Sequence, residues 1–158
     1  MNKAPLTKAG EAKLRAALQT HKTTDRQRLR VALNEALAHG DLKENAEYHA
    51  AKDEQGLLEA KIRYIESQLQ SCTVIDVLQF KTLDKIMFGA TVTLKNLETE
   101  KNMVIQLVGE SETELENGKI SYKSPIAQAC ISQKQGDFIE VKTPSGNDSY
   151  EIISIKYI

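Results

Sequence analysis

Two acidic residues, Asp41 and Glu44, lie three positions apart where the sequence predicts that a helix begins. Paired carboxylate oxygens are the ligands that a hard divalent cation such as Mg²⁺ prefers. Two acids alone hold Mg²⁺ weakly, because the ion requires an octahedral set of ligands and releases its water reluctantly. We therefore expect no stably bound metal in the free protein. The pair could still complete a metal site if a partner supplied the remaining oxygens.

The same spacing has a purely structural interpretation, which the spacing alone favours. An acidic N-cap followed three residues later by Glu forms a capping box, and both charges favour the positive end of the helix dipole. A third interpretation is a transition-metal site formed by His39, Asp41, Glu44 and His49. It is weak, because two histidines ten residues apart across a loop have no recognised ligand spacing.

The elements that must position the two acids are a pair of helices. From about Thr7 to Cys72 the sequence has no proline and is rich in good helix formers. The connection over residues 38–44 is so short that the helices must form an antiparallel hairpin, with Gly40 capping the first of them. The second helix, expected over 45–72, has a heptad stripe that indicates a packing seam. Its members are Tyr48, Ala51, Gln55, Leu58, Ile62, Ile65, Leu69 and Cys72.

The first helix is less regular than the second. One seam starts at Leu14 and Leu18, and another continues through Leu29, Leu33 and Ala36, one residue out of phase with the first. The stretch between the two seams, residues 19–28, contains no apolar residue. We therefore predict a break or kink near residues 21–25, with Thr24 or Asp25 capping the second piece.

The second half of the chain has a period of two from about residue 88 onward, which is typical of strands. Strands are expected over 90–95, 103–107, 138–143 and 150–157. Asn117-Gly118 predicts a tight hairpin, and Ser124-Pro125 predicts the start of a short helix that ends near Ile131. The expected fold class is α+β: a two-helix coiled-coil hairpin over 1–75 with its tip near 39–45, a linker over 76–85, and an antiparallel sheet with one short helix over 86–158.

Composition narrows the class of protein. The 158 residues are 41% hydrophobic and 27% charged, which is typical of a soluble globular chain. Residues 1–75 contain 12 Lys and Arg against 10 Asp and Glu, and residues 76–158 contain 9 against 12. Neither half has the basic excess of a typical duplex-DNA binder, so a protein partner is favoured. Without a signal peptide, a membrane span or a CxxC motif, we expect a cytoplasmic protein with two reduced cysteines.

The segment over 39–51, His-Gly-Asp-Leu-Lys-Glu-Asn-Ala-Glu-Tyr-His-Ala-Ala, resembles the signature of the Gre family of bacterial transcript-cleavage elongation factors, and its GreA branch in particular. The resemblance continues over 74–77, 88–92 and 124–127, and covers essentially the whole chain. After the segment that matches 124–127, the family pattern often continues with a glycine and a lysine. This chain instead has Ile-Ser-Gln over 131–133.

The resemblance implies a function that depends on a partner. In this family the coiled coil enters the secondary channel of bacterial RNA polymerase, and an FKBP-like C-terminal domain docks on the largest subunit. Asp41 and Glu44 would help to hold the second Mg²⁺ of the polymerase and position the attacking water, so that the polymerase cleaves its own backtracked RNA. The chain would then be a monomer that is not itself an enzyme and has no cofactor of its own.

The resemblance also implies roles for other residues. Asn45 and Tyr48 would orient the tip or the RNA, and Ser124 and Pro125 would lie on the polymerase-docking surface. Three basic residues one turn apart would contact the extruded RNA 3′ end, although the residues alone favour a solvated charged face. They are Lys22, Arg26 and Arg30.

Two other functions remain open at this point. A peptidyl-prolyl isomerase would need an apolar, aromatic-lined pocket, and the second half of the chain has few aromatic residues and no tryptophan. A channel binder that inhibits the polymerase without promoting cleavage is the other alternative. The intact pair Asp41 and Glu44 argues against it.

Overall fold

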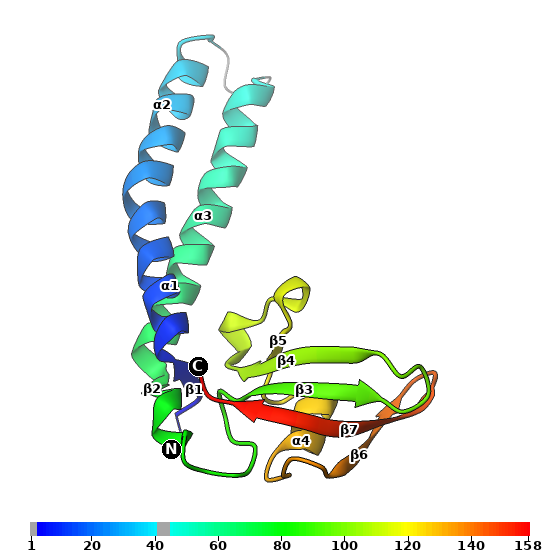
Figure 1. Cartoon of the computed structure of the whole chain (residues 1–158). Helices are drawn as coiled ribbons and strands as arrows, with labels where there is room; N and C mark the ends of the chain where they lie inside the picture. Colours follow the sequence, from blue (N-terminus) through cyan, green and yellow to red (C-terminus); the bar gives the residue numbers. More distant parts are fainter. Residues whose placement is uncertain (1–2, 41–44) are drawn as a thin grey trace. The chain divides into compact units, whose positions relative to one another are not determined.

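The structure is a computed structural model that describes residues 3–40 and 45–158 (Figure 1). The chain forms two compact units. One unit is Glu11–Ser71, and the other combines the N-terminal residues up to Gly10 with Cys72–Ile158. The first is helical and the second contains a sheet with one short helix, which confirms the predicted α+β class.

The helical unit is a hairpin of two long arms (Figure 1). The first arm consists of α1 (Lys8–Thr20), the π-helical segment η1 (His21–Asp25) and α2 (Arg26–Leu37). The second arm is α3 (Ala46–Ser71), whose 26 residues give a helix about 39 Å long at about 1.5 Å per residue. The first arm ends before the predicted Gly40 cap: α2 has Ala38 as its C-cap, and Gly40 follows two residues later with φ 106°.

The predicted heptad seam is the contact between the arms. Leu58 and Ile62 of α3 form a buried cluster with Leu29 of α2, and Leu18 packs against that cluster. Ile62 is 1% exposed and Leu29 is 3% exposed. These apolar contacts stabilise the helices, because most helical stability in proteins comes from packing of an apolar face rather than from intrinsic propensity.

Of the break or kink predicted near residues 21–25, the break is wrong, although the irregularity lies at the predicted place. The chain stays helical through η1, and neither Thr24 nor Asp25 caps a new helix: Asp25 has helical φ and ψ and makes no side-chain cap bond. A π turn takes one residue more than an α turn. The extra residue absorbs the one-residue offset between the two seams, so the helix has no need to end.

Gly56 lies within α3, where a Cβ atom would meet nothing within 4 Å. Glycine in a helix interior is less favourable than alanine, because the unfolded chain gains more backbone freedom. We expect Gly56→Ala to raise the free energy of unfolding of the hairpin by about 1 kcal/mol. Chemical denaturation followed by helical circular dichroism measures the change. A decrease would mean that this surface of α3 has a contact for which glycine is needed.

The sheet of the second unit has five strands in the order β5-β4-β3-β7-β6. They are β3 (Thr91–Asn96), β4 (Asn102–Val108), β5 (Lys119–Ser121), β6 (Phe138–Thr143) and β7 (Gly146–Lys156). The helix α4 (Pro125–Cys130) packs near β6, and its buried Ala127 and Cys130 join the core (Figure 1). Burial raises the pKa of the Cys130 thiol to about 11, which keeps it protonated and unreactive.

The sheet differs from the expectation in two details. The pair β4 and β5 is parallel, so the sheet is mixed rather than purely antiparallel. Asn117-Gly118 does not close a two-residue hairpin. Asn117 instead ends a short 3₁₀ turn, Gly118 has φ 73°, and the chain reversal is closed by an isolated bridge between Glu114 and Lys119. The Asn-Gly pair correctly predicts a residue with left-handed backbone conformation at Gly118, but it does not determine how many residues the turn contains.

Three very short strands were not predicted from the sequence: β5 in the five-stranded sheet, and a pair of strands outside it. The strand β1 (Pro5–Thr7) pairs in parallel with β2 (Thr73–Ile75), which places the first residues of the chain with the C-terminal unit. Three residues are too few for a period to be recognised. The stretch expected as a linker, 76–85, begins with a 3₁₀ helix over Val77–Phe80. Within residues 3–40 and 45–158, no helix is both long and apolar enough to cross a membrane.

Candidate functional site

Asn45 ties together the two helix ends that flank the connection between the arms. Its side-chain amide nitrogen donates to the carbonyl oxygen of Ala36 at 2.6 Å, near the end of α2. Its side-chain oxygen accepts from the backbone N–H of Tyr48 at 3.1 Å. The second bond has the geometry of an N-cap, because α3 begins at Ala46 and Tyr48 is its third residue. One side chain thus satisfies a backbone group on each arm.

This geometry bears on the two interpretations of the acidic pair. The N-cap bond at the start of α3 is made by Asn45, so a capping box formed by Asp41 and Glu44 is not needed to begin that helix. Asp41 and Glu44 themselves lie outside the described residues. Their role as metal and water ligands therefore stays a prediction. The capping role of Asn45 was missed from the sequence, although Asn is among the best N-cap residues.

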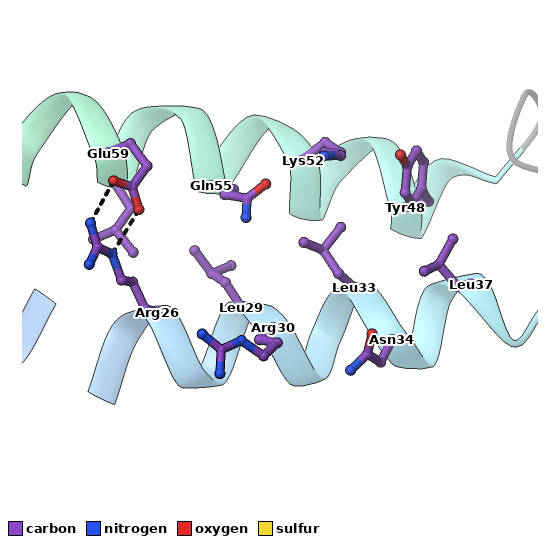
Figure 2. A pocket seen from close by; sticks show the side chains of 11 residues that line it. Arg26, Leu29, Arg30, Leu33, Asn34, Leu37, Tyr48, Lys52, Gln55 and Glu59 are labelled. Atoms are coloured by element: carbon purple, nitrogen blue, oxygen red, sulfur yellow. Dashed lines mark hydrogen bonds and ion pairs between the residues drawn. The ribbon is translucent and has the colours of Figure 1, made fainter. Parts of the chain in front are cut away.

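A groove of about 450 Å³ runs along the hairpin between α2 and α3 (Figure 2). Its apolar part is formed by leucines of both arms, and Tyr48 lies at the end nearer the connection. Arg30 and Lys52 add positive charge to it. The lining residues are Arg26, Leu29, Arg30, Leu33, Asn34, Leu37, Tyr48, Lys52, Gln55, Leu58 and Glu59. The groove can therefore accept a ligand that combines a flat or apolar group with negative charge.

The three basic residues predicted to contact RNA are not equivalent in the structure. Arg26 donates two hydrogen bonds to the Glu59 carboxylate, both at 2.9 Å (Figure 2). Lys22 forms an ion pair with Glu66 at 3.4 Å. Arg30 donates to the amide oxygen of Gln27 at 3.4 Å, and no acid among the described residues is bonded to it. Two of the three cations are thus partly neutralised by acids of α3.

The ion pair between Arg26 and Glu59 predicts a pH dependence. The hydrogen bonds from Arg26 hold the pKa of the Glu59 carboxyl below its ordinary value. A carboxyl whose pKa is lower in the folded state stabilises that state above its ordinary pKa, and loses this contribution as the pH falls through the lowered value. Because both side chains are about one third exposed, the effect on stability is expected to be small.

We expect a carboxyl titration by NMR to show a pKa for Glu59 below the ordinary value of a glutamate. In Arg26→Ala the pKa of Glu59 should return to the ordinary range, while Arg28→Ala should leave it unchanged. Arg28 is the matched control because it bonds Glu54 instead. An ordinary pKa of Glu59 in the unaltered protein would show that the bidentate bond does not persist in solution.

The predicted docking residues Ser124 and Pro125 form the start of α4. The Ser124 hydroxyl accepts from the backbone N–H of Ala127, and Pro125 occupies the first turn, as predicted. The preceding Lys123 lies 5.8 Å from the centre of the Tyr122 ring and 3.4 Å from a carboxylate oxygen of Glu110. The structure thus accounts for Ser124 and Pro125 as a helix cap. Their role in docking stays a prediction.

The alternative transition-metal site lies partly outside the described residues, since it includes Asp41 and Glu44. Of its histidines, His39 lies 3.9 Å from Glu47, and the ring of His49 packs edge-on against Tyr48. Within residues 3–40 and 45–158, no group of three His, Cys, Asp or Glu side chains is placed to hold a metal ion.

Comparison with known proteins identifies the family to which the chain belongs. Residues 4–74 match the family model "Transcription elongation factor, N-terminal", and residues 81–157 match "Transcription elongation factor, GreA/GreB, C-term". The two models together span nearly the whole chain. The chain belongs to the GreA/GreB family of transcription elongation factors.

Full-length relatives place it nearer the GreA members. It is 49% identical over 158 residues to transcription elongation factor GreA of Thioalkalivibrio sulfidiphilus, covering 100% of both chains. It is 48% identical to transcription elongation factor GreA of Nitrosococcus oceani, covering 99% of each chain. Among solved structures, it is similar to GreA factor homolog 1 of Thermus thermophilus, with 24% identity, a TM-score of 0.44, and coverage of 98% of this chain and 99% of that one.

Proposed function

We propose that this chain binds bacterial RNA polymerase and stimulates the polymerase to cleave its own backtracked RNA, which returns an arrested complex to synthesis. The observation that carries the proposal is the match to GreA relatives over the full length of both chains. The chain is not an enzyme in this scheme, since the active site that cleaves the RNA belongs to the polymerase.

The chemistry of the proposal rests on the two acids. In a two-metal site one ion activates the nucleophile and the other stabilises the leaving oxygen. An ion held by too few protein ligands is only partly occupied, so carboxylates brought from outside raise its occupancy. In the proposal Asp41 and Glu44 supply these oxygens to the Mg²⁺ of the polymerase, and one of them helps to deprotonate the attacking water. No metal or cofactor of the chain's own is required.

In the proposal the hairpin carries Asp41 and Glu44 to the active site of the polymerase. In the proposal the hairpin enters the secondary channel, and the C-terminal unit binds the largest subunit at its entrance. The bonds of Asn45 to Ala36 and Tyr48 support this assignment, because they tie both arms at the base of the connection that contains the acids. A positioned ligand needs such support, since small displacements of a catalytic group reduce the rate strongly.

RNA contact in the proposal falls mainly on the groove between the arms. Phosphates bind most strongly to cations that are not already paired. Arg30 meets that condition better than Lys22 and Arg26, whose charges face Glu66 and Glu59. We therefore assign the extruded RNA 3′ end chiefly to Arg30, with a monomeric cytoplasmic protein as the working form.

The experiment uses halted, backtracked elongation complexes with 5′-labelled RNA and Mg²⁺. Addition of the chain should shorten the RNA from its 3′ end, and nucleotides added afterwards should extend the shortened RNA. The same chain incubated with RNA alone should leave the RNA intact, because the chain has no active site of its own. RNA of unchanged length in the elongation complex would refute the proposal.

A further inference from the structure

The start of α1 is capped by a residue that lies far away in the sequence. Thr7 precedes α1, and its hydroxyl oxygen accepts from the backbone N–H of Gly10 at 3.0 Å, as an N-cap residue does. In a complete capping box, the third helical residue is Glu or Gln, and its side chain accepts from the N-cap backbone N–H. Here that third residue is Gly10, which has no side chain. The Thr7 N–H instead donates to Glu112 at 3.0 Å.

Glu112 occupies the space that a side chain of residue 10 would fill. A Cβ atom built on Gly10 would collide with the Glu112 carboxylate, and Gly10 is buried. The Thr7 hydroxyl donates to the other oxygen of the same carboxylate. Thr7 is only 4% exposed, so these bonds are shielded from water. Glu112 thus completes the capping box of α1 from 105 residues away.

The same carboxylate also caps its own short helix. The backbone N–H of Gly109 donates to Glu112 at 2.8 Å, and Glu112 ends the 3₁₀ turn Glu110–Glu112, which follows β4. The two segments are in close contact, because a Cβ atom on Gly109 would lie 2.6 Å from the carbonyl oxygen of Pro5. One carboxylate therefore accepts from backbone groups on both sides of the contact between β1 and the end of β4.

We propose that Glu112 is a positioning residue that holds the first turn of α1 against the residues that follow β4 in the C-terminal unit. We call this set of bonds from Thr7 and Gly109 to Glu112 the latch. All partners of Glu112 lie within the C-terminal unit, whereas α1 continues without interruption from Lys8 to Thr20 into the hairpin. The second connection between the units leaves α3 at Ser71 and enters β2, which pairs with β1 beside the latch. The latch thus holds the point where the hairpin joins the unit assigned to polymerase docking. Its effect on RNA cleavage rests on the proposed function.

The test separates the latch from simple helix capping. Glu112→Ala removes the carboxylate from both caps, while the Thr7 hydroxyl can still accept from Gly10. In Gly10→Glu combined with Glu112→Ala, residue 10 supplies a new carboxylate to the Thr7 N–H and completes a local capping box, but nothing replaces the bond to Gly109. Glu110→Ala is the control, because Glu110 lies in the same 3₁₀ turn and its side chain pairs only with the exposed Lys123 among the described residues.

Amide hydrogen exchange by NMR gives the first readout, without any polymerase. We expect Glu112→Ala to speed exchange at Thr7 and Gly109 by about tenfold, as the loss of charged hydrogen bonds predicts. Gly10→Ala alone should speed exchange by a similar factor, because its Cβ collides with the Glu112 carboxylate. In the double variant Gly10→Ala, Glu112→Ala this collision is absent, so exchange should be no faster than in Glu112→Ala. The Gly10→Glu, Glu112→Ala protein should recover slow exchange at Thr7 only. Unchanged exchange in Glu112→Ala would overturn the latch.

RNA cleavage gives the second readout. Glu112→Ala should lower the maximal rate of cleavage several-fold with a smaller change in the concentration needed for half of it, and Glu110→Ala should change neither. The Gly10→Glu, Glu112→Ala protein should stay as slow as Glu112→Ala. Full recovery there would reduce Glu112 to a helix cap and overturn its positioning role. If the unaltered chain fails to stimulate cleavage, the proposed function falls, while the exchange data still decide the latch.

Discussion

Alanine at Asp41 or at Glu44 is expected to reduce polymerase-dependent RNA cleavage by about a hundredfold or more, while binding to the polymerase stays nearly unchanged. In the proposed function each carboxylate acts on the Mg²⁺ of the polymerase active site and not on the docking surface. The bond from Tyr48 to Asn45 makes a structural cause less plausible, because the start of α3 has its own cap. Single-turnover cleavage and competition binding, measured on the same complexes, separate the two quantities.

The dependence on Mg²⁺ sharpens this prediction. If the acids raise the occupancy of a weakly held ion, a higher Mg²⁺ concentration should restore part of the cleavage in either variant. Glu47→Ala is the matched control: it removes an equal charge from the first turn of α3, where the exposed Glu47 side chain forms an ion pair with His39 at 3.9 Å. Equal losses of binding and cleavage in the Asp41 and Glu44 variants would show that the acids hold the hairpin together instead.

Leu58→Ala should strongly destabilise the hairpin itself. Leu58 is 7% exposed and packs with Leu29 and Ile62 in the seam between the arms. Truncation of a buried leucine removes apolar contacts and leaves a cavity, so we expect the free energy of unfolding of the hairpin to fall by about 3 kcal/mol. Hydrogen exchange resolved along the chain should show the loss in α2 and α3 but not in the core of the sheet.

The neighbouring leucine provides the control for this change. Leu57 is 65% exposed, and Leu57→Ala is the same chemical substitution one residue away. It should change the free energy of unfolding by less than about 0.5 kcal/mol. Comparable losses at the two positions would mean that α3 is rotated in solution relative to the seam seen here.

Much of the architecture is already present in the sequence. The heptad from Leu58 to Ile65 identifies the buried side of α3, because a period near 3.5 can only serve a seam with another helix. Ser124-Pro125 identifies the start of α4, since both residues act within one turn of the chain. The strand β6 lies over the residues that its alternation predicts, 138–143. These features depend on local spacing, which the sequence displays directly.

Contacts between distant residues were decided only by the tertiary structure. The one-residue offset in the first arm was visible, but a break and a π turn both accommodate it, and the spacing alone does not decide between them. Residues such as Arg26 and Glu59, or Thr7 and Glu112, have no signal in the sequence that pairs them, because hydrogen bonds over such separations depend on where the backbone has been brought. The sequence therefore determined the elements and the acidic motif, and the fold determined which side chains hold them in place.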